Sequence, residues 1–279
     1  MSDLRIGLAL GGGGARGLAH IAMIEAFDEL GLKPAVIAGT SMGALIGAAY
    51  ASGLEGRLIR DHAERVLANK VQLARLLFNP GEGHRIFDLI EFKLFGPMLV
   101  NGETLARIVF PPGVAVFVEA TAIPLKIVAT DFYGRREVVI DNGPMGPAVA
   151  ASIAIPGVIA GPKIDGRLMV DGSITNPVPF DHVQAGSDIT VAIDVIGGPV
   201  PRRAKGPTNF DLALGGSQIL MRQIARLKRE QRPPDIYVEP LLDGFRVLEF
   251  FRAQEILAAA APAKDELKRR LEAHLAKAS

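Results

Sequence analysis

Short apolar runs alternate with stretches of helical periodicity in the first part of the chain. The run LRIGLAL at 4–10 is followed by four glycines, and ARGLAHIAMIEAFDEL at 15–30 places apolar residues at helical spacing before Gly31. A second run, AVIAG at 35–39, precedes the small-residue, helix-compatible stretch at 42–53. Continuous apolar runs are typical of buried parallel strands, so this order predicts an α/β unit with a glycine loop after its first strand.

Further apolar runs continue this pattern toward the C-terminus. Residues 55–115 are less regular and predict mostly helix. Strands are predicted over 124–132, 136–140, 166–173, 187–196 and 235–240, and helices over 146–157, over 210–230 and from about Val247 onward. The stretch GGPVPRRAKGPTN at 197–209 is rich in Pro and Gly and is the best linker candidate.

The composition is that of an ordinary globular protein and limits the classes of function. Apolar residues make up 49% and charged residues 22% of 279 residues, which allows a sizeable core. A net charge of +1 gives no signal for a nucleic-acid partner. The absence of cysteine excludes disulfides, thiolate metal sites and a cysteine nucleophile. It fits a reducing compartment, and the first ten residues are a poor signal peptide, so we expect a cytoplasmic protein.

Two uncharged stretches, Pro34–Leu54 and Asn142–Pro162, have the length of a membrane span. The second contains four prolines, too many for one helix. The first is better explained as a buried strand, a turn and a helix. We therefore predict no membrane span, and peripheral contact with a membrane stays open.

The glycine loop GGGARG at 12–17 satisfies the pattern G-x-G-x-x-G between a strand and a helix, which is the setting of a dinucleotide fingerprint. Its usual companion is a carboxylate at the end of the second strand, where this chain has Thr40 and Ser41. A nucleotide-binding enzyme is therefore a disfavoured alternative. Glycine N–H groups can instead bind a tetrahedral oxyanion, with positive charge from Arg16, and a plain helix-capping turn is the structural alternative.

The pentad GTSMG at 39–43 has the G-x-S-x-G pattern of a nucleophile elbow. It lies between a predicted strand and a predicted helix, as an elbow does, and the helix N-terminus favours the negative charge that develops there. A glycine turn that packs closely on a neighbour is the alternative. The elbow assigns Ser41 as a candidate nucleophile.

A general base for Ser41 is harder to find among the histidines. His20 lies in the first amphipathic helix, His62 and His84 lie in polar stretches that we expect to be exposed, and His274 lies in a charged terminal helix. His182 follows Asp171 in the usual α/β-hydrolase order but has no special setting. Asp171 ends a predicted strand before a glycine, and a desolvated carboxylate can act as a base.

Together these motifs resemble the patatin-like phospholipases, whose pattern is a G-G-G-x-[KR]-G loop, then G-x-S-x-G, then D-G-[GA]. The chain has GGGARG, GTSMG and DGS in that order, and ASIAIPG also resembles a family block. The stretch PDIYVEP…GFRVLEFFRAQEIL resembles the C-terminal part of bacterial members related to neuropathy target esterase (NTE). The resemblance covers most of the chain.

The resemblance implies a Ser–Asp dyad without a catalytic histidine, in a protein that hydrolyses lipid esters as a phospholipase A or lysophospholipase. It assigns Ser41 as nucleophile and Asp171 as base. It assigns the oxyanion hole to Gly12, Gly13, Gly14 and Arg16. Ser173 departs from the glycine or alanine common at that position, outside the dyad. The scheme requires no metal or cofactor, and a non-catalytic lipid-binding protein is the second alternative.

With this resemblance the pattern predicts one α/β fold over residues 1–279, a three-layer α/β/α arrangement with a mostly parallel central sheet. The core is expected over about 4–200 and a helical C-terminal extension over about 201–279. The apolar segment at 85–99 is expected to be either a core helix or a cap that lines the acyl channel or touches the lipid surface, with Phe87, Ile90 and Leu94 on one face at helical spacing.

Overall fold

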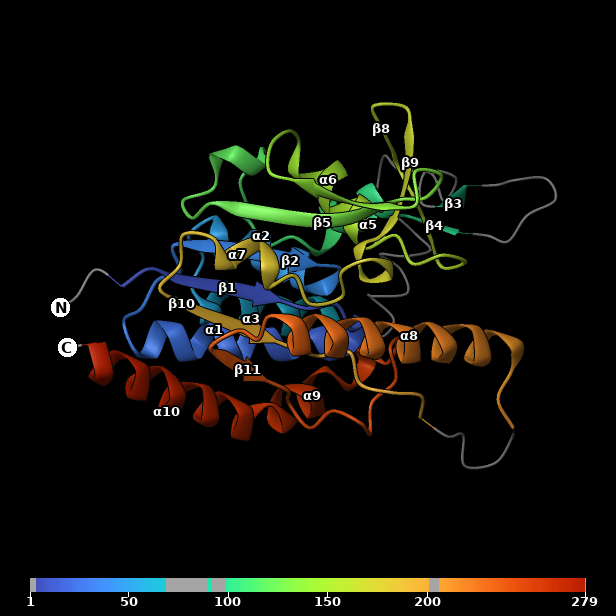
Figure 1. Ribbon diagram of the computed structural model, residues 1–279. Coiled ribbons are helices and arrows are strands. Elements are labelled where there is room, and N and C mark those ends of the chain that lie inside the picture. The colour runs from blue at the N-terminus through green and yellow to red at the C-terminus, as the bar shows by residue number, and fades with distance from the viewer. Residues whose placement is uncertain (1–3, 69–89, 92–98, 201–205, 279) are drawn as a thin grey trace.

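A central, mostly parallel sheet organises the protein (Figure 1). The computed structural model describes residues 4–68, 90–91, 99–200 and 206–278. The order of the eight-stranded sheet is β11-β10-β1-β2-β5-β9-β8, with β6 paired to β5. Its strands are β1 (Ile6–Leu10), β2 (Val36–Thr40), β5 (Leu125–Asp131), β6 (Arg136–Ile140), β8 (Lys163–Ile164), β9 (Arg167–Asp171), β10 (Ile189–Ile193) and β11 (Ile236–Val238).

The first five strands in this order run parallel, whereas β6 and β9 run antiparallel to β5. A second, three-stranded sheet is formed by β3 (Ile90–Glu91), β4 (Leu99–Asn101) and β7 (Ile159–Ala160). The mixed but mostly parallel sheet confirms the predicted fold class.

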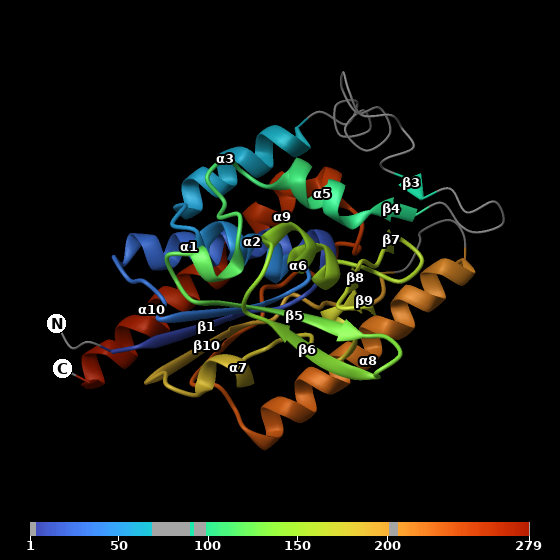
Figure 2. The same cartoon turned by 90° about the horizontal axis from the view of Figure 1, so that it is seen from above.

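Helices cover both faces of the sheet (Figure 2). The α-helices are α1 (Ala19–Glu29), α2 (Met42–Ala51), α3 (Gly56–Leu67), α5 (Gly102–Val109), α6 (Met145–Ser152), α7 (Asp181–Gln184), α8 (Asn209–Gln231), α9 (Ala253–Ala259) and α10 (Ala261–Ala278). The short 3-10 helices are η1 (Gly14–Leu18), η3 (Val118–Ala120), η4 (Gly172–Ile174) and η5 (Phe250–Arg252). The first helical segment therefore begins as a tight 3-10 turn where the sequence predicted regular α-helix.

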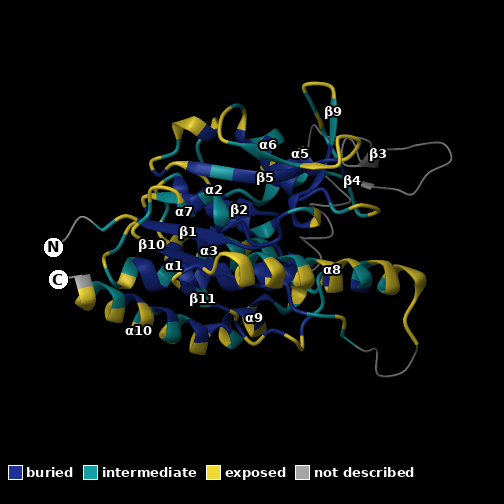
Figure 3. Ribbon diagram, in the orientation of Figure 1, coloured by how far each residue is buried: buried dark blue, intermediate teal, exposed yellow. Residues whose placement is uncertain are grey.

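Alternating side chains of β1 divide the core into two layers. Leu8 and Leu10 pack into the main hydrophobic cluster with α1, α2, α9 and α10, whereas Ala9 packs into a smaller cluster with α7 and α8. Both layers are buried, as the burial colours of Figure 3 show for β1 and β10. A strand that is covered on both faces explains why its sequence is a continuous apolar run.

The C-terminal part is joined to this core and is not purely helical. β11 extends the sheet by pairing with β10 in parallel, and α10 packs against α1 and β11. Lys264 and Lys268 of α10 both pair with Glu29 at the end of α1. The predicted boundary near residue 200 remains a prediction, and residues 201–205 of the predicted linker lie outside the described residues.

The two uncharged stretches form short elements. The first contains β2 and the ten-residue helix α2, and the second contains the eight-residue helix α6. Among the described helices, none combines the length and the apolar character that crossing a bilayer requires.

Most of the predicted core helix or cap at 85–99 lies outside the described residues. Ile90 and Glu91 are described as β3 and pair antiparallel with β4. Ile90 therefore lies in a strand, and the helical spacing predicted through this residue is wrong at that point.

Candidate active site

One edge of β5 brings two distant parts of the chain together. β2 pairs with the first half of β5 and places Thr40 opposite Val128. β9 pairs with the second half from the opposite direction and places Asp171 opposite Ala129. Since β6 pairs with β5 along residues that overlap both, β2 and β9 share the other edge of β5. Their C-terminal ends therefore meet head to head, and Ser41 follows immediately after β2.

The backbone at Ser41 has the sharp turn that an elbow requires. Its φ of 54° and ψ of −122° lie in a region that residues with a side chain rarely adopt. The flanking glycines permit the turn, because a Cβ at Gly43 would overlap the carbonyl oxygen of Leu10 and one at Gly39 would crowd Gly43 and Ala44. Strain at a single non-glycine residue is characteristic of functional sites.

Ser41 and Asp171 are in direct contact and are almost fully buried. The Ser41 hydroxyl donates to Asp171 Oδ2 at 2.8 Å, and the two residues are 4% and 5% exposed. Burial raises the pKa of Asp171, against the hydrogen bonds from the Ser173 N–H and the Ser41 hydroxyl that lower it. The Ser173 N–H donates to the other oxygen, Oδ1, at 2.8 Å. The carboxylate is thus fixed in orientation and is a stronger base than an exposed aspartate.

Three further polar residues, which were not among the predicted site residues, hold this pair in place. Ser152, at the end of α6, accepts a hydrogen bond from the Ser41 N–H at 2.8 Å and donates to the Val128 carbonyl at 2.6 Å. The Thr130 hydroxyl donates to the Asp171 carbonyl at 3.0 Å. The Thr40 hydroxyl donates to the Asn176 carbonyl at 2.9 Å. The nearest sequence signal for Ser152 was its position in ASIAIPG, the segment that resembles a family block.

The N–H groups of the glycine loop are held by carbonyl acceptors from three parts of the chain. The Gly11 N–H donates to Ile193, the Gly12 N–H to Pro177 and the Ala15 N–H to Val247. The ring of His20 bonds to the Gly11 carbonyl at 2.7 Å, and burial lowers its pKa to about 4, so it is a neutral packing residue.

The predicted oxyanion donors differ in whether their N–H groups already have a hydrogen-bond acceptor. The Gly12 N–H is already bonded to the Pro177 carbonyl at 2.9 Å. Within the described part of the chain, the N–H groups of Gly13 and Gly14 have no hydrogen-bond acceptor. Gly14 and Ser41 border the same cavity. Gly13 and Gly14 are therefore the available pair of backbone donors.

Arg16 lies behind the loop and is fully buried. Its guanidinium donates to the carbonyls of Gly13, Gly198 and Phe245 at 3.3–3.4 Å. Burial lowers its pKa to about 10, so it stays charged at neutral pH. These contacts fix the loop to two later segments of the chain, a role that was not predicted from the sequence. The assignment of Arg16 to the oxyanion hole, as a nearby positive charge, remains a prediction.

A cavity of about 270 Å³ extends from Ser41 between the helices. Its lining is almost entirely apolar and comes from η1, α2, α3, α5, the segment after α6 and the segment before α9. Among its lining residues are Leu18, Met42, Leu45, Ile59, Leu67, Leu105, Val109, Ile153, Val158, Leu248 and Phe250. An apolar space that begins at the candidate nucleophile suits an acyl chain.

The histidines are placed differently from the dyad. His62 was expected to be exposed, yet it borders this cavity, its buried Nε2 has no hydrogen-bond partner among the described residues, and burial lowers its pKa. His182 bonds to Glu137 and lies 3.9 Å from Asp181 Oδ2. His274 Nδ1 bonds to the Arg270 carbonyl within α10, far along the chain from the candidate site, and His84 lies outside the described residues.

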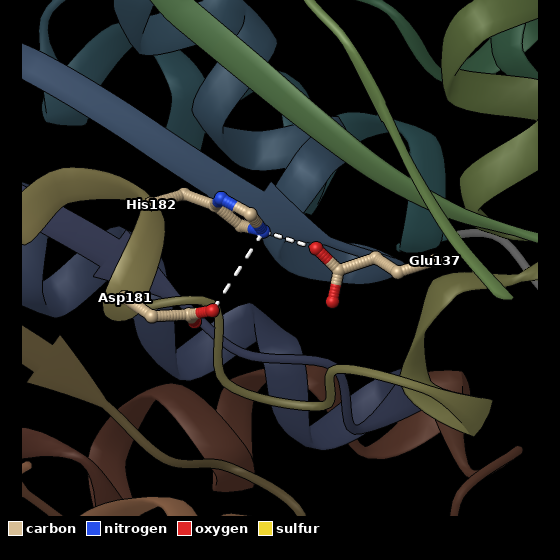
Figure 4. Close-up of side chains that lie close together, drawn as sticks. All are labelled: Glu137, Asp181 and His182. Carbon is tan, nitrogen blue, oxygen red and sulfur yellow. Dashed lines mark hydrogen bonds and ion pairs between the residues drawn. The ribbon is translucent and has the colours of Figure 1, made fainter.

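Glu137, Asp181 and His182 form a cluster between β6 and α7, in which the His182 ring is turned toward both carboxylates (Figure 4). Each offers one ligand atom within 4.8 Å of the others, a grouping that the sequence did not reveal. The Lys228 ammonium lies 2.8 Å from Asp181 Oδ1 and already supplies the positive charge. We therefore interpret the cluster as an ion-pair network that joins α7 to β6 and α8.

Comparison with known proteins agrees with the motifs. A family model described as Patatin-like phospholipase matches residues 8–183. An uncharacterised NTE family protein of Mycobacterium tuberculosis is 35% identical over 197 residues, which are 70% of this chain and 50% of that protein. The lysophospholipase nte1 of Aspergillus fumigatus is 25% identical over 278 residues, which are 90% of this chain and 17% of that protein. The chain thus spans about half the length of the bacterial relative.

A solved structure has the same fold. VipD from Legionella pneumophila superposes with a TM-score of 0.53 at 13% identity, over 96% of this chain and 67% of that one. The resemblance that the three motifs predicted is confirmed.

Proposed function

Since the chain belongs to the patatin-like phospholipase family, we propose that it hydrolyses lipid esters with a Ser41–Asp171 dyad. The observation that carries this proposal is the 2.8 Å hydrogen bond from the Ser41 hydroxyl to a buried carboxylate, at a strained turn that opens into an apolar cavity. The dyad chemistry itself requires neither a metal nor a cofactor.

In the acylation step, Asp171 Oδ2 takes the proton of the Ser41 hydroxyl while Oγ attacks the ester carbonyl carbon. The tetrahedral intermediate collapses, the bond to the alcohol oxygen breaks, and the alcohol leaves with the proton from Asp171. The acyl group is then an ester of Ser41. In deacylation Asp171 takes a proton from water, the hydroxide attacks the acyl carbon, and Ser41 recovers its proton as the fatty acid leaves.

Negative charge develops on the former carbonyl oxygen in both steps. Gly13 and Gly14 offer the two N–H groups that can stabilise it, since neither has an acceptor among the described residues. Preorganised donors of this kind lower the barrier most when their own positions are fixed. The bonds of Gly11, Gly12 and Ala15 fix the loop on both sides of this pair.

The substrates we propose are phospholipids or lysophospholipids. The apolar cavity suits a fatty acyl chain, and the fungal relative is named a lysophospholipase. An acyl chain enters such a cavity only by leaving a membrane or micelle, so we also propose peripheral contact with a lipid surface during catalysis.

The proposal is tested by trapping with an alkyl fluorophosphonate, followed by hydrolysis assays on diacyl phospholipid, lysophospholipid and neutral acylglycerol. Wild type should be labelled on Ser41 and should release fatty acid, whereas Ser41→Ala should do neither and should lose activity on the order of 10⁴-fold or more. Ser217→Ala, an exposed serine of α8, is the matched control and should retain full activity. A folded wild type that binds lipid but is neither labelled nor active would indicate the non-catalytic alternative.

A further inference from the structure

The segment from Phe245 to Phe250 lies beyond the part of the chain that the family model matches, which ends at residue 183. It nevertheless reaches the candidate active site. Leu248 and Phe250 line the same cavity as Ser41 and Gly14. These two side chains form a wall of the cavity that comes from the C-terminal part of the chain.

This wall is fixed relative to the glycine loop. The Ala15 N–H donates to the Val247 carbonyl at 2.7 Å, and the Arg16 guanidinium donates to the Phe245 carbonyl at 3.4 Å. A Cβ at Gly14 would overlap the Val247 carbonyl oxygen, so only glycine permits this approach. The wall therefore keeps a constant position beside the reacting centre.

The segment is also braced from its other side. Arg252 lies over the Phe245 ring at 4.2 Å and donates to the Gly244 carbonyl and to Glu249. The segment continues through η5 into α9, which packs against η1 and lies beside α1 (Figure 2). A wall held by backbone bonds and a packed helix resists displacement by a bound chain.

We propose that Leu248 and Phe250 set the acyl-chain length that the enzyme accepts. The proposal rests on the proposed hydrolase function and adds a specificity element outside the three family motifs. The cavity is small, about 270 Å³, so one large side chain gained or lost changes the usable space considerably. Leu248 is 39% exposed and lies at the rim, whereas Phe250 is half-buried.

The test measures kcat/KM for p-nitrophenyl butyrate, octanoate and palmitate with the full chain. Leu248→Trp narrows the cavity and should lower the palmitate-to-butyrate ratio about tenfold, because rejection of extra methylenes is worth this order of discrimination. Phe250→Ala enlarges the cavity and should move the optimum toward longer chains. Opposite shifts of the preferred chain length in these two variants are expected if Leu248 and Phe250 limit the length of the cavity.

Two matched controls come from the same region. Phe251 is 55% exposed and Leu241 is 83% exposed, and neither lines the cavity. Phe251→Ala and Leu241→Trp should leave the chain-length profile of wild type unchanged. Fluorophosphonate labelling of Ser41 in each variant verifies that the dyad is intact, and melting curves verify folding.

The outcomes separate this inference from the proposed function. If wild type is neither labelled nor able to cleave the butyrate ester, the proposed function fails. If wild type is active but the ratio is the same in Leu248→Trp, Phe250→Ala and wild type, only the inference fails. An equal shift in Phe251→Ala would also overturn it, since a general loosening of the segment would then explain the effect.

Discussion

Two aspartates that lie close in sequence have opposite environments. Asp171 is 5% exposed, its carboxylate accepts hydrogen bonds from the hydroxyl of Ser41 and from Ser173, and burial raises its pKa. Asp181 is also penalised by burial, but the Lys228 ammonium and the Asn176 amide hold its pKa below the ordinary value. Both carboxylates are hydrogen-bonded, so hydrogen bonding alone does not distinguish the proposed base from Asp181. A nearby cation distinguishes the two aspartates. It stabilises the charged carboxylate and so weakens the affinity for a proton on which a base depends.

The same comparison explains why the cluster of Glu137, Asp181 and His182 is not proposed as a site for acyl transfer. Asp181 and His182 resemble an acid–base pair, yet the His182 ring is bonded to Glu137 and faces Asp181, and none of these residues lines the apolar cavity (Figure 4). The first cluster, Ser41 and Asp171, combines desolvation of the carboxylate, backbone strain at the serine and access to a cavity. The second cluster, Glu137, Asp181 and His182, consists of partly exposed groups in an ion-pair network with Lys228.

The largest expected difference comes from the same substitution at both aspartates. Asp171→Asn removes the proposed base and should lower kcat/KM for a soluble ester on the order of 10³-fold or more. Asp181→Asn should leave activity within about threefold of wild type, and so should His182→Ala. Equal losses in Asp171→Asn and His182→Ala, at unchanged melting temperature, would replace the dyad by a triad.

The motifs pointed to Ser41 and Asp171 but not to the residues around them. Asp171 ends β9 directly before Gly172, and Ser41 follows β2 within a pentad that begins and ends with glycine. Strand ends are where parallel sheets place reactive groups. The strands, their order along the chain and the α/β class followed from the apolar runs. That β9 approaches β5 antiparallel could not be read from its residues, because the alternation of a short strand does not encode direction.

Residues that act through tertiary contacts were not predictable from the sequence. Ser152 is one more small residue in a small-residue helix until the fold places its hydroxyl beside the Ser41 N–H. Arg16 was expected near the oxyanion because of its motif, but its carbonyl partners Gly198 and Phe245 come from segments outside the three motifs, and no pattern pairs them with Arg16. Lys228 meets Asp181 only because α8 returns across the sheet.

The second expected effect is the pH dependence of activity. Only the deprotonated form of Asp171 can accept the Ser41 proton, and its pKa is raised above the ordinary value of 3.8. Activity should therefore fall about tenfold per pH unit below a midpoint that lies above 3.8, as measured from kcat/KM on a soluble ester between pH 3.5 and roughly 8. Asp181→Asn should have the same midpoint. A midpoint at or below 3.8 would contradict the assignment of a desolvated base.

The third effect is on stability, and its sign differs between the two aspartates. A carboxyl whose folded pKa is raised contributes stability that is present below 3.8 and is lost as pH rises through the raised pKa. Wild type at neutral pH therefore carries an unfavourable buried charge at Asp171, and Asp171→Asn should unfold at higher urea than wild type. This gain should shrink as the pH is lowered toward 3.8.

Asp181 has the opposite linkage. Its folded pKa is lowered, so its contribution is present above 3.8 and is lost as pH falls through the lower folded value. Asp181→Asn should be less stable than wild type at neutral pH, and the difference should vanish in acid. Urea midpoints at pH 7 and at about one pH unit below 3.8 measure both signs, and shifts of the same sign in the two variants at pH 7 would remove the distinction drawn between the clusters.

The smallest expected effect concerns the backbone strain at Ser41. A residue with a side chain at φ 54° and ψ −122° costs of order 1–3 kcal/mol, whereas glycine adopts such angles freely. Ser41→Gly should therefore be more stable than Ser41→Ala by about 1 kcal/mol, although both lack the proposed nucleophile.

Ser217, within the helix α8 that carries Lys228, provides the control with ordinary helical backbone. There the order should reverse, with Ser217→Ala more stable than Ser217→Gly by about 1 kcal/mol, because glycine weakens a helix interior. Urea unfolding of the four variants measures both differences. The same order at both positions would show that the turn at Ser41 stores no strain, and the first cluster would then differ from the second in desolvation and cavity access alone.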